Sequence, residues 1–328
     1  MSNKKGIAFY LDKKFIVYEE ETSKVQSILL DYNIEKCFEN IKDIVYSYDN
    51  NDIIIKIFRD SLIFISDKRY ESEDWEKSKN RLIKLANIIL AVMFSTSSEY
   101  LNMKKGSTTF FIHDKEITAK NIIHCTFSNE YNDIEFVSCD GTIKLDDLKQ
   151  RDDIEAFERN NNTSFVYNIK TINEFFKLFE KNLSLIINKK IENIVYMLYR
   201  SILETKKSNF DISILLSFFV IEDVLSDMWK NALIERDLYN KLKDDMNYTI
   251  AIKSNMLYMN GIISKEELEK IDFARKKRNS IAHANFEFQD KFDFSKMFSI
   301  SSEIFLFSIE LFAKYYNINF KMQYGFEG

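Results

Sequence analysis

One stretch of the sequence is apolar on nearly every side of a helix, and it constrains the fold more than any other feature. Residues 212–225 read Ile-Ser-Ile-Leu-Leu-Ser-Phe-Phe-Val-Ile-Glu-Asp-Val-Leu. A surface helix carries one apolar stripe, whereas a helix that is apolar all round must have neighbours on every side. The run therefore predicts the central helix of a helical bundle.

Helical periodicity continues through the second half of the chain. From about residue 171 onward, apolar residues recur at the spacing of a helix face. Ser264, followed three residues later by Glu267, forms a capping-box pattern that marks where one helix begins. We expect helices at 171–186, 189–205, 211–231, 238–258, 264–284 and 292–316.

The first 150 residues have a different pattern, rich in β-branched and aromatic runs that favour strands. One capped helix is expected at 72–94. Expected strands are 7–11 and 15–18, joined as a hairpin by 12–14, then 53–58 and 62–65 around a turn at 59–61, and 108–112, 122–127, 134–137 and 142–145. The chain is thus predicted to be α+β. A β-rich N-terminal module (1–155) with a sensor or regulatory role precedes an all-α domain (165–328), and the linker is expected at 159–163.

Length and composition limit the classes of protein to which this chain can belong. At 328 residues the chain can form two domains, and its net charge of −5 argues against indiscriminate nucleic-acid binding. Three cysteines make no even-numbered disulfide framework, and nothing at the N-terminus reads as a signal peptide. Uncharged apolar runs are shorter than the ~20 residues that span a bilayer. We therefore expect a reduced cytoplasmic protein without a membrane partner.

A charge interrupts the apolar stripe of the predicted helix 264–284. Arg278 falls in the middle of a stripe where a leucine would be expected, and a guanidinium there needs a partner. Asn279 and His283 are four residues apart and share one flank of the helix. The stripe consists of Leu268, Ile271, Ala274, Ile281 and Ala282.

Glu222 is the second charge in an apolar setting. It is in phase with the apolar residues of the predicted central helix, namely Leu215, Phe218, Phe219, Leu225 and Trp229. Two charges of opposite sign on two helices of one bundle satisfy each other most economically, so we predict that Glu222 accepts a hydrogen bond from Arg278. The alternative is that Glu222 reaches an exposed end of the bundle.

These residues resemble a known family. Arg278-Asn279-Ser280-Ile281-Ala282-His283 matches the R-N-x-x-x-H form of the motif of the HEPN superfamily, and the resemblance covers roughly residues 170–318. It implies a HEPN-like helical fold and metal-independent RNA cleavage at a homodimer interface, with no cofactor. A β-rich module before such a bundle resembles the Apea-type proteins of bacterial phage defence. That resemblance implies a regulated toxin or antiviral effector with a phage-derived trigger or an inhibitory partner.

The chemistry of the residues fits this expectation. RNA carries its own nucleophile, the 2′-hydroxyl, so an enzyme needs a proton shuttle such as His283 and a cation such as Arg278 for the phosphorane-like transition state. Asn279 can orient the imidazole or the phosphate, and Glu222 holds Arg278. The basic run Arg275, Lys276 and Lys277 is expected to contact RNA phosphates, or else to form a solvated helix face.

Spacing along the helix indicates that one copy is not enough. Arg278 and His283 are about 140° apart on a straight helix, so one chain presents them awkwardly to a single phosphate. Two copies related by a two-fold axis bring both pairs to one cleft, as the resemblance implies.

The alternative function is that of a non-catalytic HEPN-fold protein that dimerises or holds RNA, with Arg278 and His283 kept as a structural pair. A metal site is not expected, because adjacent strand residues point to opposite faces; its candidate ligands are His113, His124, Cys125 and Cys139. Three aromatic residues of the last helix are expected in bundle or dimer packing rather than base stacking: Phe305, Phe307 and Phe312.

Overall fold

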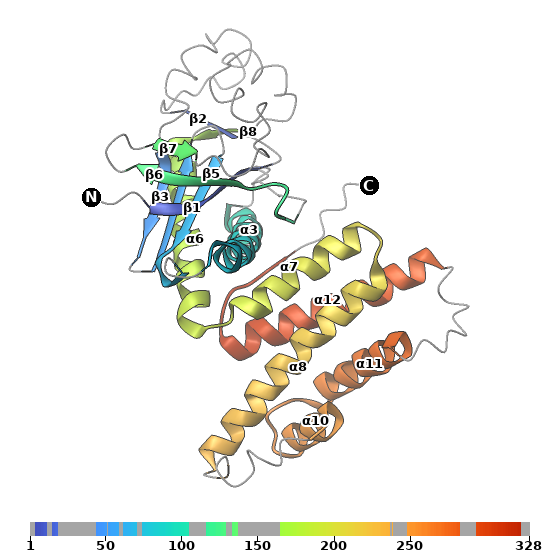
Figure 1. Ribbon diagram of the computed structural model, residues 1–328. Coiled ribbons are helices and arrows are strands. Elements are labelled where there is room, and N and C mark those ends of the chain that lie inside the picture. Colours follow the sequence, from blue (N-terminus) through green and yellow to red (C-terminus); the bar gives the residue numbers. More distant parts are fainter. Residues whose placement is uncertain are drawn as a thin grey trace. The chain divides into compact units, whose positions relative to one another are not determined.

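The computed structural model places strands in the first part of the chain and helices in the second (Figure 1). It describes residues 4–11, 15–18, 44–50, 52–58, 62–70, 74–104, 116–128, 133–136, 165–236, 238, 248–282 and 293–322. The predicted α+β class, with a β module at the N-terminus, is confirmed. The chain divides into two compact units, Met1–Ser184 and Leu185–Gly328. The predicted linker at 159–163 lies outside the described residues.

Most described strands of the first unit form one antiparallel sheet in the order β3-β4-β5-β1-β6-β7. Every residue of β5 is buried, because strands in the middle of the sheet have neighbours on both edges and packing on their faces. The bounds are β1 Lys4–Tyr10, β3 Ile44–Asp49, β4 Ile53–Phe58, β5 Leu62–Asp67, β6 Ile123–Ser128 and β7 Asp133–Phe136. A second, two-stranded sheet pairs β2 (Phe15–Tyr18) with β8 (Phe165–Asn168) in parallel.

The strand predictions were partly right. The hairpin around 59–61 is confirmed, since β4 and β5 pair antiparallel. The hairpin predicted around 12–14 is wrong: β1 pairs with β5 and β6, whereas β2 pairs with β8. Ile7, Ala8 and Phe9 of β1 are fully buried, so this strand takes a central place that a local turn could not supply. The expected strands 108–112 and 142–145 lie outside the described residues.

Helix α3 (Trp75–Lys104) forms the core of the first unit together with α6 (Ile169–Lys189). It confirms the helix predicted at 72–94 and continues to Lys104. Asn182 of α6 donates to Oγ1 of Thr96 (3.2 Å) and to Oε2 of Glu99 (3.0 Å), so these three buried polar side chains satisfy one another. By length and composition Trp75–Tyr100 could cross a membrane, but 89% of its apolar window is buried, as in the core helix of a soluble protein.

The second unit is a helical bundle around α8 (Phe210–Glu235), which contacts each of the other four helices in its described part. Val220, Ile221, Val224 and Leu225 of α8 have no measurable exposure. The prediction that this run forms the central helix is therefore confirmed. The other helices are α7 Glu192–Lys206, α10 Ile250–Met259, α11 Lys265–Ala282 and α12 Phe294–Tyr316.

Small hydroxyl side chains let α7, α8 and α12 approach one another closely. Ser201 of α7 lies 2.9 Å from the hydroxyl of Ser213 and 2.7 Å from that of Ser217 on α8. Ser301 of α12 donates to Ser213 (3.0 Å), and Thr205 of α7 also reaches Ser213 (2.7 Å). These buried hydroxyls satisfy one another, so their burial leaves few hydrogen bonds unmade.

The predicted capping box fixes the beginning of α11. The backbone N–H of Ser264 donates to Oε2 of Glu267 (2.7 Å), and the backbone N–H of Glu267 donates to Oγ of Ser264 (3.1 Å). This reciprocal pair satisfies two backbone donors that the helix itself cannot. The capping box therefore fixes the first turn of α11. It also fixes which side of the helix each later residue lies on.

Gly6 tests the packing of the sheet. A methyl group on Gly6 would overlap the carbonyl oxygen of Ile65 and lie 2.7 Å from Cε2 of Phe64. Gly6→Ala should therefore lower the free energy of unfolding of the first unit by about 1–3 kcal/mol, the usual cost of overpacking. Urea denaturation followed by circular dichroism measures this.

Gly261 is the matched control. Its φ is +69° and a methyl group there would meet no heavy atom within 4 Å. Gly261→Ala should cost only ~1 kcal/mol, the penalty of a left-handed backbone, and it acts on the helical unit instead. A Gly6→Ala protein as stable as the wild type would contradict the described strand register.

Candidate functional site

Arg278 lies where α11 faces α8, as the apolar stripe predicted. Of the predicted stripe, the helix buries Ile271, Ala274 and Ile281, whereas Leu268 is half-buried and Ala282 is exposed. Arg278 is half-buried on the same side as the three buried residues. Its guanidinium carbon is 5.6 Å from the ring centroid of Phe218 on α8. The face of an aromatic ring attracts a cation, so Phe218 offers the guanidinium a partner without neutralising it.

Asn279 binds the same guanidinium. Nη1 of Arg278 donates to Oδ1 of Asn279 at 3.2 Å. The sequence suggested that Asn279 orients an imidazole or a phosphate; the structure shows it bound to the arginine. Ring and carboxamide together orient Arg278 while leaving its charge in place.

The predicted hydrogen bond between Glu222 and Arg278 is not formed, and this part of the prediction is wrong. Within the described part of the chain, Arg278 makes no ion pair within 4 Å, and its only hydrogen-bond acceptor is Asn279. Glu222 is half-buried one turn beyond Phe218 on the same row of α8, near enough for its charge to act on Arg278. The two charges interact through space rather than by contact.

Lys253 of α10 is a site residue that sequence reasoning missed. Its Nζ donates to Oγ of Ser226 at 3.2 Å, one turn beyond Glu222 on α8. Phe218, Glu222 and Ser226 form a row at i, i+4 and i+8, about 12 Å long. Arg278 sits at one end of this row, Lys253 at the other, and the Glu222 carboxylate lies between them. The available signal was that Lys253 is the one charged residue of the sequence Ile250–Met259.

Burial decides the titration of Glu222. Desolvation raises the pKa of the Glu222 carboxyl, and the negative charge of Asp223 adds to this; the positive charges of Arg278 and Lys253 offset the rise only in part. Had either cation contacted the carboxylate, a lowered pKa would be expected. The row therefore holds two cations whose hydrogen-bond partners are neutral, an arrangement suited to receiving an anion.

The other cations of the predicted RNA-binding run differ in their partners. Arg275 of the predicted RNA-binding run binds Asp272, with Nη2 at 3.1 Å from Oδ1. Lys276 is exposed, and Nζ of Lys277 lies 5.6 Å from the ring centroid of Phe273. RNA contacts from these three residues stay a prediction. His283 lies outside the described residues.

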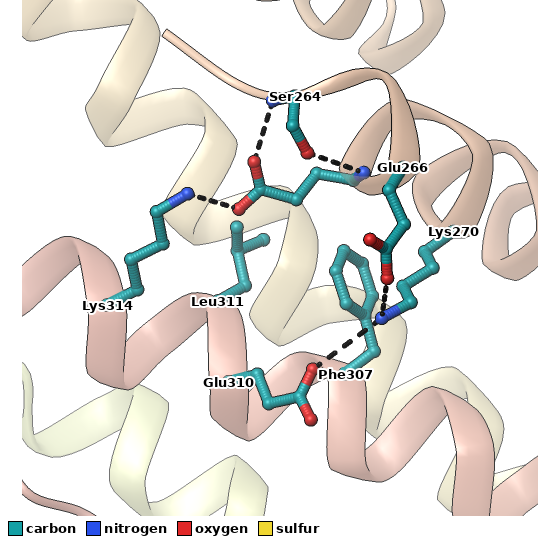
Figure 2. Close-up of a pocket in the computed structure, with 8 residues that line it drawn as sticks. Ser264, Glu266, Lys270, Phe307, Glu310, Leu311 and Lys314 are labelled. Carbon is teal, nitrogen blue, oxygen red and sulfur yellow. Dashed lines mark hydrogen bonds and ion pairs between the residues drawn. The ribbon is translucent and has the colours of Figure 1, made fainter.

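A cavity of about 430 Å³ opens between the start of α11 and α12 (Figure 2). Lys314 binds Glu267 across it at 2.6 Å, and Lys270 binds Glu266 at 2.9 Å. Glu310 adds a third carboxylate, 3.8 Å from Lys270. Carboxylates thus outnumber the lysines, which does not suit a phosphate. The lining residues Ser264 to Lys270 also lie about 12–21 Å along the helix from Arg278.

The two candidate metal ligands that the structure describes, His124 and Cys125, do not converge. The ring of His124 stacks on Trp75 with centroids 3.6 Å apart, while Cys125 is fully buried in the apolar core on the opposite face of β6. The predicted alternation is confirmed. Burial, with the nearby charges of Lys5 and Lys79, lowers the pKa of His124. His113 and Cys139 lie outside the described residues.

No protein-family model, curated protein or solved structure matches this chain. The HEPN resemblance stays an expectation drawn from the motif at 278–283 and from Glu222.

Glu222→Gln tests the electrostatics of the row. The folded protein holds a proton on Glu222 more readily than the unfolded chain does, so wild-type stability falls as pH rises above the ordinary glutamate value of about 4.3. The glutamine variant keeps the shape but does not titrate. It should be at least as stable as the wild type near pH 7, with a difference within about 1 kcal/mol that shrinks toward pH 4. Thermal unfolding across this range measures it.

Glu235→Gln, at the exposed end of the same helix, is the control and should not change the pH profile. Strong destabilisation by Glu222→Gln at neutral pH would instead indicate a contact ion pair.

Proposed function

We propose that this chain is a metal-independent endoribonuclease of the HEPN type that acts as a homodimer in the cytoplasm. The observation that supports this most is the row on α8. Arg278 and Lys253, from two other helices, lie at its ends with neutral hydrogen-bond partners. Half-buried cations without contact ion pairs are costly to maintain, and work on a phosphate is a reason to maintain them.

The proposed reaction needs no external nucleophile. The 2′-hydroxyl attacks the adjacent phosphorus as a base removes its proton, and the bond to the 5′-oxygen breaks as an acid protonates that oxygen. The products carry a 2′,3′-cyclic phosphate and a 5′-hydroxyl. His283 is proposed for the proton transfers, because an imidazole titrates near neutrality.

Arg278 is proposed to bind the non-bridging oxygens of the reacting phosphate. The planar guanidinium can give two parallel hydrogen bonds to a phosphate, and Phe218 and Asn279 limit its rotation. Lys253 is proposed to contact a neighbouring phosphate. In the free protein the carboxylate of Glu222, which lies between them, reduces the repulsion between these two cations.

A second copy completes the proposed site. Because Arg278 and His283 are about 140° apart on a straight helix, one chain presents them awkwardly to the same phosphate. Two copies around a two-fold axis supply both groups from both chains.

The first unit is proposed to sense a trigger or to restrain the nuclease, in the manner of a regulated toxin or anti-phage effector. It forms a separate unit, with its own sheet and core. The alternative is a bundle that dimerises or holds RNA without cutting it.

Cleavage of mixed RNA in EDTA tests the proposal. The wild type should produce 2′,3′-cyclic phosphate ends, and His283→Ala and Arg278→Ala should each reduce the rate by about 10²-fold or more. Arg236→Ala, an exposed arginine at the end of α8, is the matched control and should cut normally. Gel separation of end-labelled RNA, with mapping of the ends, measures this.

Binding must be measured beside cleavage, because a regulated nuclease can be inactive without its trigger. If RNA is bound but not cut, and Arg278→Ala weakens the binding, the alternative of an RNA-holding protein is supported. Cutting that persists in both variants, or RNA binding that neither changes, would refute the proposed site.

Lys253→Gln tests the second cation. In a His283→Ala background, the substitution should weaken RNA binding about 3–10-fold and reduce the salt dependence of log Kd by roughly one counterion. Lys253→Arg should retain both. Lys265→Gln, exposed at the start of α11 beside Glu269, is the control. Fluorescence anisotropy at several salt concentrations measures the slope, and an unchanged slope for Lys253→Gln would exclude this contact.

A further inference from the structure

Helix α8 is apolar on nearly every side, yet one strip of it faces solvent. Phe219 is 40% exposed, and Ile212, two turns earlier, is 44% exposed. Asp223, one turn after Phe219, is exposed as well. These residues fall at i, i+7 and i+11, so they lie on one side of the helix. We call Ile212, Phe219 and Asp223 the outer strip of α8.

The outer strip lies beside the row on α8 that carries the two cations. Phe218 and Phe219 are adjacent in sequence, so their side chains are about 100° apart around the helix. Phe218 is buried, with the guanidinium carbon of Arg278 5.6 Å from its ring centroid, whereas Phe219 faces solvent. With side chains that reach ~5–6 Å from the helix axis, the two rings are roughly 8 Å apart. A ligand whose charged group binds Arg278 can therefore place a flat group on Phe219.

An exposed aromatic ring beside a phosphate-binding arginine suits a nucleotide. Bases of single-stranded RNA stack on aromatic side chains while the backbone lies along positive charge. The phenylalanines expected in bundle packing do not compete for this role. Phe305, Phe307 and Phe312 are at most 5% exposed, so they cannot stack with a base.

Asp223 adds a hydrogen-bond acceptor at the edge of this aromatic ring. Residues at i and i+4 have Cβ atoms ~5–6 Å apart, so the carboxylate of Asp223 lies beside Phe219. Within the described part of the chain, Asp223 makes no hydrogen bond or ion pair. Asp227, one turn further, accepts a hydrogen bond from the hydroxyl of Tyr316. Asp223 thus keeps both carboxylate oxygens for a partner from outside the bundle.

A carboxylate in this position favours guanine over the other bases. It repels phosphates, so it suits the base of a nucleotide and not the backbone. The Watson–Crick edge of guanine carries two parallel donors, N1–H and the N2 amino group, which match the two carboxylate oxygens. Adenine and cytosine place an acceptor nitrogen beside their amino donor, and uracil has its single N3–H between two carbonyl oxygens. The carboxylate therefore binds these three bases less well.

We propose that the outer strip of α8 is a guanine-binding site, in which Phe219 stacks with the base, Asp223 accepts hydrogen bonds from N1–H and the N2 amino group, and Arg278 binds the adjacent phosphate. The inference rests on the proposed function and adds a base preference to it, since the strand would be cut beside unpaired guanosines. Ile212 extends the strip by about 10 Å along α8 and offers apolar contact to a further base.

Binding of short RNA strands tests the base preference. Uridine oligomers with a central guanosine, inosine, adenosine or uridine are added to His283→Ala protein, and fluorescence anisotropy gives each Kd. The guanosine strand should bind about 10-fold more tightly than the all-uridine strand, as expected for one bidentate contact. Inosine lacks the N2 amino group and should lose most of this gain. With wild-type protein, cuts in a mixed RNA should fall beside guanosines.

Two substitutions separate the edge of the base from its face. Asp223→Asn should lower the ratio of the uridine-strand Kd to the guanosine-strand Kd from about 10 to about 1–2. Phe219→Ala should weaken binding of all four strands about 10-fold, whereas Phe219→Trp should retain it. The side chains are exposed, so circular dichroism should stay unchanged.

The controls are an exposed phenylalanine and an exposed carboxylate away from the strip. Phe294→Ala, on a residue of α12 that is 61% exposed, and Glu235→Gln, at the end of α8, should both bind the strands as the parent protein does.

The outcomes distinguish this site from the proposed nuclease. Equal binding of the four strands, or a guanosine preference that survives Asp223→Asn, would overturn the guanine site, and cutting of RNA by the wild type would then leave the proposed nuclease standing. A wild type that neither binds nor cuts RNA would refute the proposed function and this inference with it. If Phe219→Ala changes the sedimentation equilibrium but not RNA binding, Phe219 contacts a second copy and the base site is wrong.

Discussion

Removal of α8 from water is the constraint on which the helical unit depends. This helix is apolar on nearly every side, and each Å² of apolar surface taken out of water contributes about 25 cal/mol. One neighbour could cover only one side. The described helices α7, α10, α11 and α12 each contact it.

Two polar regions of α8 show opposite ways of meeting that constraint. Ser213 and Ser217 close a set of hydrogen bonds with the hydroxyls of α7 and α12, so burial costs them little. The row with Glu222 is different. Its carboxylate is half-buried, and the nearby cations bind an aromatic ring, a carboxamide and a hydroxyl instead of the carboxylate. A contact ion pair between Glu222 and one of these cations would have neutralised both charges. The lack of such a pair suits a site that binds an anion.

The local pattern predicted what depends on neighbours within a few residues. The hairpin of β4 and β5, the capping box at Ser264 and the inward face of α11 follow from such spacing, and the structure has them. The pairing of β1 with β5 and β6 could not be predicted in this way, because its partners come from distant parts of the chain. The bond between Glu222 and Arg278 failed for a related reason. Helical phase predicts which side of its own helix a residue lies on. It does not predict which position along the neighbouring helix the arginine side chain reaches.

The sequence by itself determined that α8 is central, that Ser264 caps the start of α11, and that Arg278 turns toward the core. These properties follow from hydrophobic periodicity and from a helix cap. Both depend only on residues in adjacent turns of one helix. Only the tertiary structure decided that Arg278 rests on Phe218, that Lys253 reaches Ser226 and that Phe219 is left exposed. The physical reason is that distances between helices are set by the packing of all their side chains together, and no single segment contains that information.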